Sequence, residues 1–144
     1  GAGTEQDRVL LSELLDLLAA QRVDLTRAMR SLASSVRGDP GPARSLFADP
    51  APFDEWSLRW ATRRGELGAD PAATAASMDL LNPLYVPRNH LVEAALDAAT
   101  AGDMGPFEEL LAVLRDPFVE QTGAEAYALG APEGAGAYRT FCGT

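Results

Sequence analysis

Residues 82–90 read Asn-Pro-Leu-Tyr-Val-Pro-Arg-Asn-His, and this stretch decides how the chain is organised. Pro83 and Pro87 cannot both lie inside one helix, because a proline there removes a backbone hydrogen bond and clashes with the carbonyl four residues earlier. Asn82, which precedes a proline, is biased towards an extended conformation that suits a turn or a cap. Helix-forming residues precede the stretch and an amphipathic run follows it. The sequence therefore predicts a bent connector between two helical blocks, and Pro87 is acceptable in the first turn of whatever helix follows.

Before the connector, apolar residues recur at the spacing of helices. The predicted inner faces are Leu11, Leu14, Leu15 and Leu18 in the first helix and Leu25, Met29, Leu32, Ala33 and Val36 in the second. Asp24 is the predicted N-cap of the second helix. Residues 38–52, rich in proline and glycine, are expected to form a loop. Phe53, Trp56 and Trp60 then follow at helical spacing and should anchor the core, because aromatic side chains bury large areas. Asp70 caps a further short helix that ends at Leu81, with Pro71 as its first residue.

After the connector, two more amphipathic helices are predicted, over residues 88–101 and from residue 106 to Pro117. Their expected inner faces are Leu91, Ala94, Ala95 and Ala98, and then Phe107, Leu110, Leu111 and Leu114. No segment has the pattern of a strand. We therefore predict an all-α fold. Residues 1–117 should form a bundle-like module of about six helices, and residues 118–144 an irregular, glycine-rich tail that ends in a cysteine.

Composition excludes several classes of function. The 144 residues carry a net charge of −9, and all twelve basic residues are arginine, so we expect neither nucleic acid nor a membrane as a partner. Without lysine, the chain cannot contain a phosphate-loop lysine or a kinase-type strand lysine. The single His90 and the single Cys142 cannot build a zinc site. One unpaired cysteine favours a cytoplasmic location. Because the chain opens at Gly1 rather than at a methionine, it is expected to be a piece of a longer protein.

Polar residues near the helix starts suggest few catalytic groups. His90 lies in the first turn of its helix without an evident Ser or Cys partner, which favours a structural role. The adjacent carboxylates at 54–55 and 108–109 do not face each other on a helix, and they suit a helix N-terminus electrostatically. Arg88 and Asn89 either hold an anion at a helix N-terminus or tie the connector to a neighbouring segment, and the second role is favoured.

Several motifs resemble the C-terminal region of the selenoprotein O family, over residues 10–144. The first is the Asn-Pro-x-Tyr-Val-x-Arg-Asn pattern of the connector, formed by Asn82, Pro83, Tyr85, Val86, Arg88 and Asn89. A Trp-x-x-x-Trp helix with Arg63 and Arg64 precedes it, and a Gly-Asp pattern leading to Leu-Leu-x-Val-Leu-Arg-x-Pro-Phe follows it. The fourth is Cys142, which occupies the third position from the C-terminal end, the family's hallmark.

The resemblance implies a function, because the family has a protein-kinase-like (pseudokinase) fold and transfers AMP from ATP to protein hydroxyl groups. The kinase-like portion is not among the matching pieces. The resemblance therefore implies a non-catalytic C-terminal module of a bacterial cytoplasmic protein adenylyltransferase, with no catalytic, cofactor-binding or metal-binding residue of its own. ATP and magnesium would bind the missing catalytic portion, which is the expected partner together with the protein substrates of the whole enzyme.

The resemblance also assigns roles to residues. Asn82, Pro83, Tyr85, Arg88 and Asn89 would form a structural connector, and Cys142 would be a redox-active tail thiol. The position of Cys142 beside Gly143 near the chain end favours an exposed thiol that can reach a cysteine elsewhere. The alternative is a free-standing helical protein–protein interaction domain whose likeness to the family is structural only.

Overall fold

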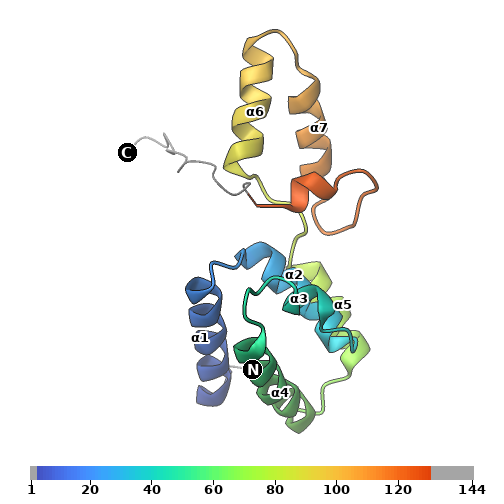
Figure 1. The fold of residues 1–144 in the computed structure, drawn as a ribbon. Coiled ribbons are helices and arrows are strands. Elements are labelled where there is room, and N and C mark those ends of the chain that lie inside the picture. Colours follow the sequence, from blue (N-terminus) through green and yellow to red (C-terminus); the bar gives the residue numbers. More distant parts are fainter. Residues whose placement is uncertain (1–2, 131–144) are drawn as a thin grey trace. The chain divides into compact units, whose positions relative to one another are not determined.

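The computed structural model describes residues 3–130, whose regular elements are all helices (Figure 1). The α-helices of these residues are α1 (Glu5–Ala20), α2 (Leu25–Val36), α3 (Gly41–Arg44), α4 (Ala51–Glu66), α5 (Pro71–Leu81), α6 (Asn89–Thr100) and α7 (Gly105–Leu114). A 3-10 helix, η1 (Glu125–Ala128), follows them. The predicted all-α fold is confirmed. Within residues 3–130, every helix is too short or too polar to cross a membrane.

The chain divides into two compact units between Asn82 and Pro83, which is inside the predicted connector. The first unit contains α1 to α5, and the second contains α6, α7 and η1. The sequence instead predicts a boundary after residue 117, and that division stays a prediction. The break at Pro83 follows from its local chemistry, because a proline cannot continue α5.

Side-chain caps start three helices of the first unit. Asp24 accepts a hydrogen bond of 2.9 Å from the backbone N–H of Arg27, and Asp70 accepts one of 2.8 Å from that of Ala73. Both predicted caps are therefore confirmed. Thr4 caps α1 in a capping box, in which the Asp7 carboxylate accepts a hydrogen bond of 2.8 Å from the backbone N–H of Thr4. Each cap satisfies N–H groups that the first helical turn leaves without a partner.

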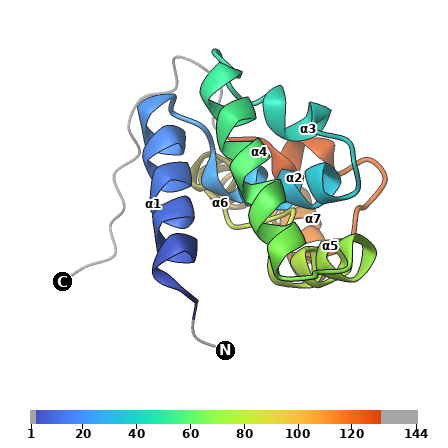
Figure 2. The ribbon, with the colours of Figure 1, turned by 90° about the horizontal axis from the view of Figure 1, so that it is seen from below.

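The core of the first unit lies where α1 packs along α4 (Figure 2), while α2 packs on α3 and α5. Its buried residues are Leu10, Leu14, Leu18, Ala28, Leu32, Ala43, Phe47, Phe53 and Trp56. The rings of Phe47, Phe53, Trp56 and Trp60 form a continuous stack, with successive centroids 4.9, 6.0 and 5.2 Å apart. Phe53 is 1% exposed and Trp56 4%. The predicted aromatic anchor is thus confirmed.

The inner face of α1 differs from the predicted one. Leu14 and Leu18 are buried as expected, but Leu10 completes their stripe, while Leu11 and Leu15 are exposed at 50% and 43%. The partner helix explains the choice, because the indole N–H of Trp56 in α4 donates to the backbone carbonyl of Leu10 at 2.8 Å. The prediction for Leu25 in α2 is also wrong, since its side chain is 54% exposed and the buried face runs through Ala28, Leu32, Ala33 and Val36.

The expected loop over residues 38–52 contains the short helix α3 and the beginning of α4. Pro52 lies in the first turn of α4, where its missing N–H costs nothing. Two contacts hold the segment in place. The Gln21 amide exchanges hydrogen bonds of 2.8 and 3.0 Å with the backbone of Asp49, and Phe47 enters the core. The loop is therefore ordered by packing and by backbone hydrogen bonds.

In the second unit, α6 and α7 form a helical hairpin (Figure 1). A small core joins Tyr85, Val113 and Ala124, so part of the predicted irregular tail packs into it. Ala95 and Leu110 are buried as expected. Ala94 and Leu111 are exposed instead, and Val113 replaces Leu111 on the inner face of α7. Each helix of the hairpin buries only a narrow stripe of side chains, so the residues beside that stripe are exposed to solvent.

Candidate functional site

Tyr85 is the centre of the connector in the second unit. Its side chain is 3% exposed and packs on Val113 and Ala124. The hydroxyl accepts a hydrogen bond of 2.9 Å from the backbone N–H of Gln121. The backbone N–H groups of Leu84 and Tyr85 both point to the carbonyl of Pro117, at 2.8 and 3.4 Å. Tyr85 therefore fixes the connector to the residues that follow α7.

Gln121 completes this arrangement, although nothing in the sequence pattern singles it out. Its side-chain amide donates to the backbone carbonyl of Val113 at 3.0 Å and to that of Asp116 at 2.9 Å. The first carbonyl belongs to the last turn of α7 and the second lies two residues beyond its end, where the chain has left the helix. Gln121 thus closes the end of α7 with its side chain and holds Tyr85 with its backbone.

Asn82 and Arg88 also form hydrogen bonds with residues distant in the sequence. In the first unit, Arg30 donates to the carbonyls of Asp79 and Asn82, at 2.9 and 3.0 Å, and so closes the end of α5. In the second unit, Arg88 is the N-cap residue of α6, and its guanidinium donates to the carbonyl of Ala128 at 3.3 Å. Asn89 is the first residue of α6 and is exposed.

Two further details of the connector concern Pro87 and His90. Pro87 lies before the cap, because Arg88 is extended at φ −99° and ψ 132°. Pro87 therefore lies just outside α6, although the first turn of a helix would accept a proline. His90 is the second residue of α6 and is half-buried.

The contacts of the connector in residues 3–130 hold backbone segments together, and its predicted role as a structural connector stays a prediction. Tyr85 and Arg88 form hydrogen bonds with the backbone of Gln121 and Ala128, and the carbonyl of Asn82 accepts a hydrogen bond from Arg30. Within residues 3–130, no three His, Cys, Asp or Glu side chains gather closely enough to hold a metal ion. Cys142 lies outside the described residues, so its predicted redox role stays a prediction.

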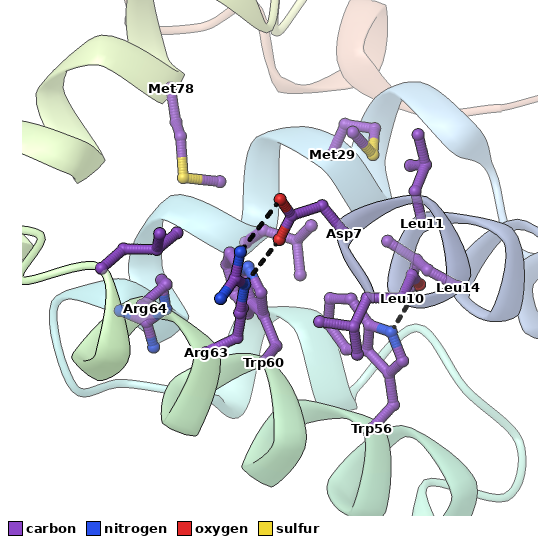
Figure 3. Close-up of a pocket in the computed structure, with 12 residues that line it drawn as sticks. Asp7, Leu10, Leu11, Leu14, Met29, Trp56, Trp60, Arg63, Arg64 and Met78 are labelled. Atoms are coloured by element: carbon purple, nitrogen blue, oxygen red, sulfur yellow. Dashed lines mark hydrogen bonds and ion pairs between the residues drawn. The ribbon is translucent and has the colours of Figure 1, made fainter. Parts of the chain in front are cut away.

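A groove in the first unit is the second candidate site (Figure 3). Its volume is about 230 Å³. The lining comes from α1, α2, α4, α5 and the residue after α4, and consists of Asp7, Leu10, Leu11, Leu14, Met29, Leu32, Trp56, Trp60, Arg63, Arg64, Leu67 and Met78. Most of these side chains are apolar. The charged groups come from the start of α1 and the last turn of α4.

Asp7 and Arg63 form a bidentate ion pair at the edge of this groove (Figure 3). The Nε of Arg63 lies 2.7 Å from one carboxylate oxygen of Asp7, and a terminal nitrogen lies 3.3 Å from the other. The hydrogen bond from Arg63, followed by that from the backbone N–H of Thr4, holds the pKa of Asp7 well below its ordinary value. The same pairing raises the pKa of Arg63. Arg63 thus fastens the start of α1 to the end of α4.

Arg64 behaves differently from its neighbour. Its guanidinium carbon lies 4.5 Å from the ring centroid of Trp60, which is a cation–π contact. Burial lowers the pKa of Arg64, and its Nε is buried without a hydrogen-bond partner among the described residues. The sequence had identified Arg63 and Arg64 only as part of a motif. The pairing of Arg63 depends on the packing of α1 against α4, whereas Arg64 stacks on Trp60 of its own helix.

Comparisons with known proteins identify the relatives of the chain. No protein-family model matches it. A protein nucleotidyltransferase YdiU of Mycobacterium sp. (strain KMS) is 53% identical over 135 residues, which cover 94% of this chain. The YdiU proteins of Cereibacter sphaeroides (strain KD131) and Pseudarthrobacter chlorophenolicus are 48% and 45% identical and each match covers 99% of it.

The matches cover only part of each relative. The chain spans 26%, 29% and 27% of the lengths of these three proteins, at their C-terminal ends. The resemblance predicted from the connector and tail motifs is confirmed. The chain therefore belongs to the YdiU protein nucleotidyltransferase family and corresponds to the C-terminal region of its members.

Proposed function

We propose that this chain is the non-catalytic C-terminal helical module of a protein adenylyltransferase, an enzyme that transfers AMP from ATP to Ser, Thr or Tyr hydroxyl groups of proteins. The observation that carries the proposal is the match to the C-terminal 26–29% of proteins named as protein nucleotidyltransferases. ATP and magnesium would bind in the part of the relatives that precedes the match. Catalysis of phosphoryl-type transfer requires groups that hold phosphates and metal ions, and this chain contributes no lysine to such a site.

The role of the module would be to support the catalytic portion. Among residues 83–130, the second unit buries few side chains, chiefly Tyr85, Ala95, Leu110, Val113 and Ala124. A helical unit of this size gains little stability from its own core, so packing against a larger body would add to it. In the first unit, Leu11 and Leu67 are exposed, and contact with a larger body would remove their apolar side chains from water. Both features suit a part that packs within a longer protein.

Cys142 would carry a second, regulatory role as a redox-active thiol. We base this proposal on its place at the third position from the chain end, which matches the family's hallmark. A cytoplasmic protein keeps such a thiol reduced until an oxidant reaches it. The partner cysteine would have to lie in the catalytic portion or in another protein, because this chain has a single cysteine.

Three preparations test the proposed function: the full-length protein, its N-terminal portion alone, and this chain alone. Each is incubated with labelled ATP, magnesium and an acceptor protein. We expect label from the full-length protein, none from this chain, and weak activity from the N-terminal portion that recovers when this chain is added. Magnesium-dependent labelling by this chain alone would contradict the proposal. An N-terminal portion that neither binds this chain nor responds to it would favour a free-standing helical interaction domain instead.

A further inference from the structure

The groove of the first unit has the size of a side-chain pocket. Its volume of about 230 Å³ is below the range of about 300–1,000 Å³ that is usual for small-molecule sites. Its walls include Met29, Met78 and Trp60 (Figure 3). Methionines adapt to the shape of a partner, and grooves with such a lining commonly receive the apolar face of a peptide helix. The groove therefore suits one or two apolar side chains of a polypeptide.

The border of the groove extends this apolar surface. Leu11 is 50% exposed and Leu67 is 61% exposed, and both belong to the lining. Leu11 lies on α1 and Leu67 directly follows α4, so exposed apolar side chains of the lining come from more than one element. Covering these side chains would remove apolar area from water, which favours association.

The charge at the border points to an acidic group on the occupant. Arg63 is already neutralised by Asp7 and by Glu66, whose carboxylate lies 3.3 Å away. Arg64, by contrast, makes a cation–π contact with Trp60, and no carboxylate of the described residues pairs with it. A carboxylate beside an apolar anchor would form a charge-assisted hydrogen bond with this guanidinium.

The position of the start of α1 indicates where the occupant comes from. Thr4 and Asp7 both contact Arg63, at 3.1 and 2.7 Å, so α1 begins at the edge of the groove. In the relatives this region is preceded by the rest of the protein, and the match to the Cereibacter protein covers 99% of this chain. Under the proposed function, the preceding polypeptide would therefore enter beside the groove. A tethered segment binds at a high effective concentration, which favours it over a separate protein.

We propose that this groove is the docking site for an amphipathic segment of the N-terminal portion, which inserts an apolar side chain between Leu11 and Leu67 and offers a carboxylate to Arg64. The inference rests on the proposed function, because it requires that the chain is part of a longer protein. It adds which surface of the module meets the catalytic portion and which chemistry the contact uses.

Site-specific photo-crosslinking in the full-length protein tests the location of the contact. A photoreactive amino acid replaces Leu11 or Leu67 in two proteins, and replaces Leu58 in the control. Leu58 lies on α4, is 72% exposed and does not line the groove. We expect crosslinks to the N-terminal portion from positions 11 and 67 but not from 58, with peptide mapping to identify the segment. Crosslinks to residues 131–144, to a second copy or to no peptide would each overturn the proposal.

A binding measurement separates failure of the groove from failure of the proposed function. The N-terminal portion is titrated with this chain carrying Leu11→Arg, Arg64→Glu or the control Leu15→Arg, which changes a 43% exposed leucine of the same helix. Circular dichroism checks that each variant is folded. We expect at least about a tenfold loss of affinity for the groove variants and less than about a twofold loss for the control. If the wild-type chain binds but all variants bind equally well, the groove is not the docking site. If the wild-type chain does not bind, the proposed function fails as well.

Discussion

The hydroxyl of Tyr85 accepts a hydrogen bond of 2.9 Å from the backbone N–H of Gln121, although 36 positions separate the two residues. The side-chain amide of Gln121 also donates hydrogen bonds to the backbone carbonyls of Val113 and Asp116, in and just after the last turn of α7. One buried ring therefore links the connector, the end of a helix and the segment that follows it. These contacts are the ones that Tyr85 of the Asn-Pro-x-Tyr motif makes within the second unit.

Removing the hydroxyl of Tyr85 tests this role. Tyr85→Phe keeps the ring but leaves the N–H of Gln121 without its partner, so we expect a loss of about 1–3 kcal/mol in the free energy of unfolding. Tyr85→Ala also removes the buried ring and should cost about 3–5 kcal/mol. Hydrogen exchange at the Gln121 amide, together with denaturant unfolding, measures both effects.

The matched control for this experiment is Tyr127→Phe. Tyr127 is half-buried and its hydroxyl lies 3.3 Å from Glu109, which is a longer contact than that of Tyr85. Burial and the nearby carboxylate raise the pKa of Tyr127, so it stays a neutral phenol. We expect a smaller loss of stability than for Tyr85→Phe. Equal losses in the two variants would show that the Tyr85 hydroxyl has no special role.

The sequence predicts elements better than it predicts which faces they bury. The helix with Phe53, Trp56 and Trp60 is correctly identified as the anchor, because large rings at helical spacing leave few alternatives. The first helix contains leucines at 10, 11, 14, 15, 17 and 18, which form overlapping stripes. Periodicity alone cannot choose between the stripes. The choice is made by α4, whose Trp56 binds the carbonyl of Leu10.

Polar contacts between distant residues are the least predictable part of the candidate sites. The connector motif and Arg88 are visible in the sequence, but Gln121 lies in a glycine-rich segment without any recognisable pattern. The pair of Asp7 and Arg63 joins residues 56 positions apart and depends on the register of α1 along α4. The split between Asn82 and Pro83 follows from the prolines, whereas the short α3 is hidden inside a proline-rich segment.

Two glycines at the end of α4 should respond oppositely to alanine. Gly65 is helical and exposed, with open space around an added Cβ, so Gly65→Ala should stabilise the fold by about 0.5–1 kcal/mol. Gly68 has φ of +64° and its N–H donates to the carbonyl of Gly65 at 3.0 Å. Gly68→Ala should therefore destabilise by about 1–2 kcal/mol, because an L-residue is strained in the left-handed region. Thermal unfolding of both variants measures the two changes in melting temperature, which should have opposite signs. Changes of the same sign would contradict the conformations described for Gly65 and Gly68.

Thiol trapping of the full-length protein tests the proposed role of Cys142. Under oxidising conditions, for example with diamide, two thiols would lose two electrons and two protons to the oxidant and form a disulfide. We expect the trapped pattern and the AMP-transfer activity of the wild-type protein to differ between oxidising and reducing conditions. Cys142→Ser should remove both differences. If all four samples have the same pattern and the same activity, Cys142 is not a redox switch.

The acid stability of the first unit should depend on Asp7. The hydrogen bond from Arg63, and then the backbone N–H of Thr4, hold the pKa of Asp7 below its unfolded value of about 3.9. A depressed folded pKa means that the ionised carboxylate stabilises the fold at every pH above about 4, and that this contribution is lost as pH falls through the lower folded value. Asp7→Asn should therefore lower stability at pH 7 and flatten the fall in stability below about pH 4.

The control is Asp16→Asn, which removes an exposed carboxylate from the same helix without touching Arg63. It should leave the stability at pH 7 and its decline in acid close to those of the wild type. Arg63→Lys provides a second comparison, because lysine keeps the charge but cannot form the bidentate contact. It should retain only part of the acid dependence. Denaturant unfolding between pH 2 and 7 measures all four proteins, and a decline for Asp7→Asn as steep as that of the wild type would show that this ion pair does not stabilise the fold.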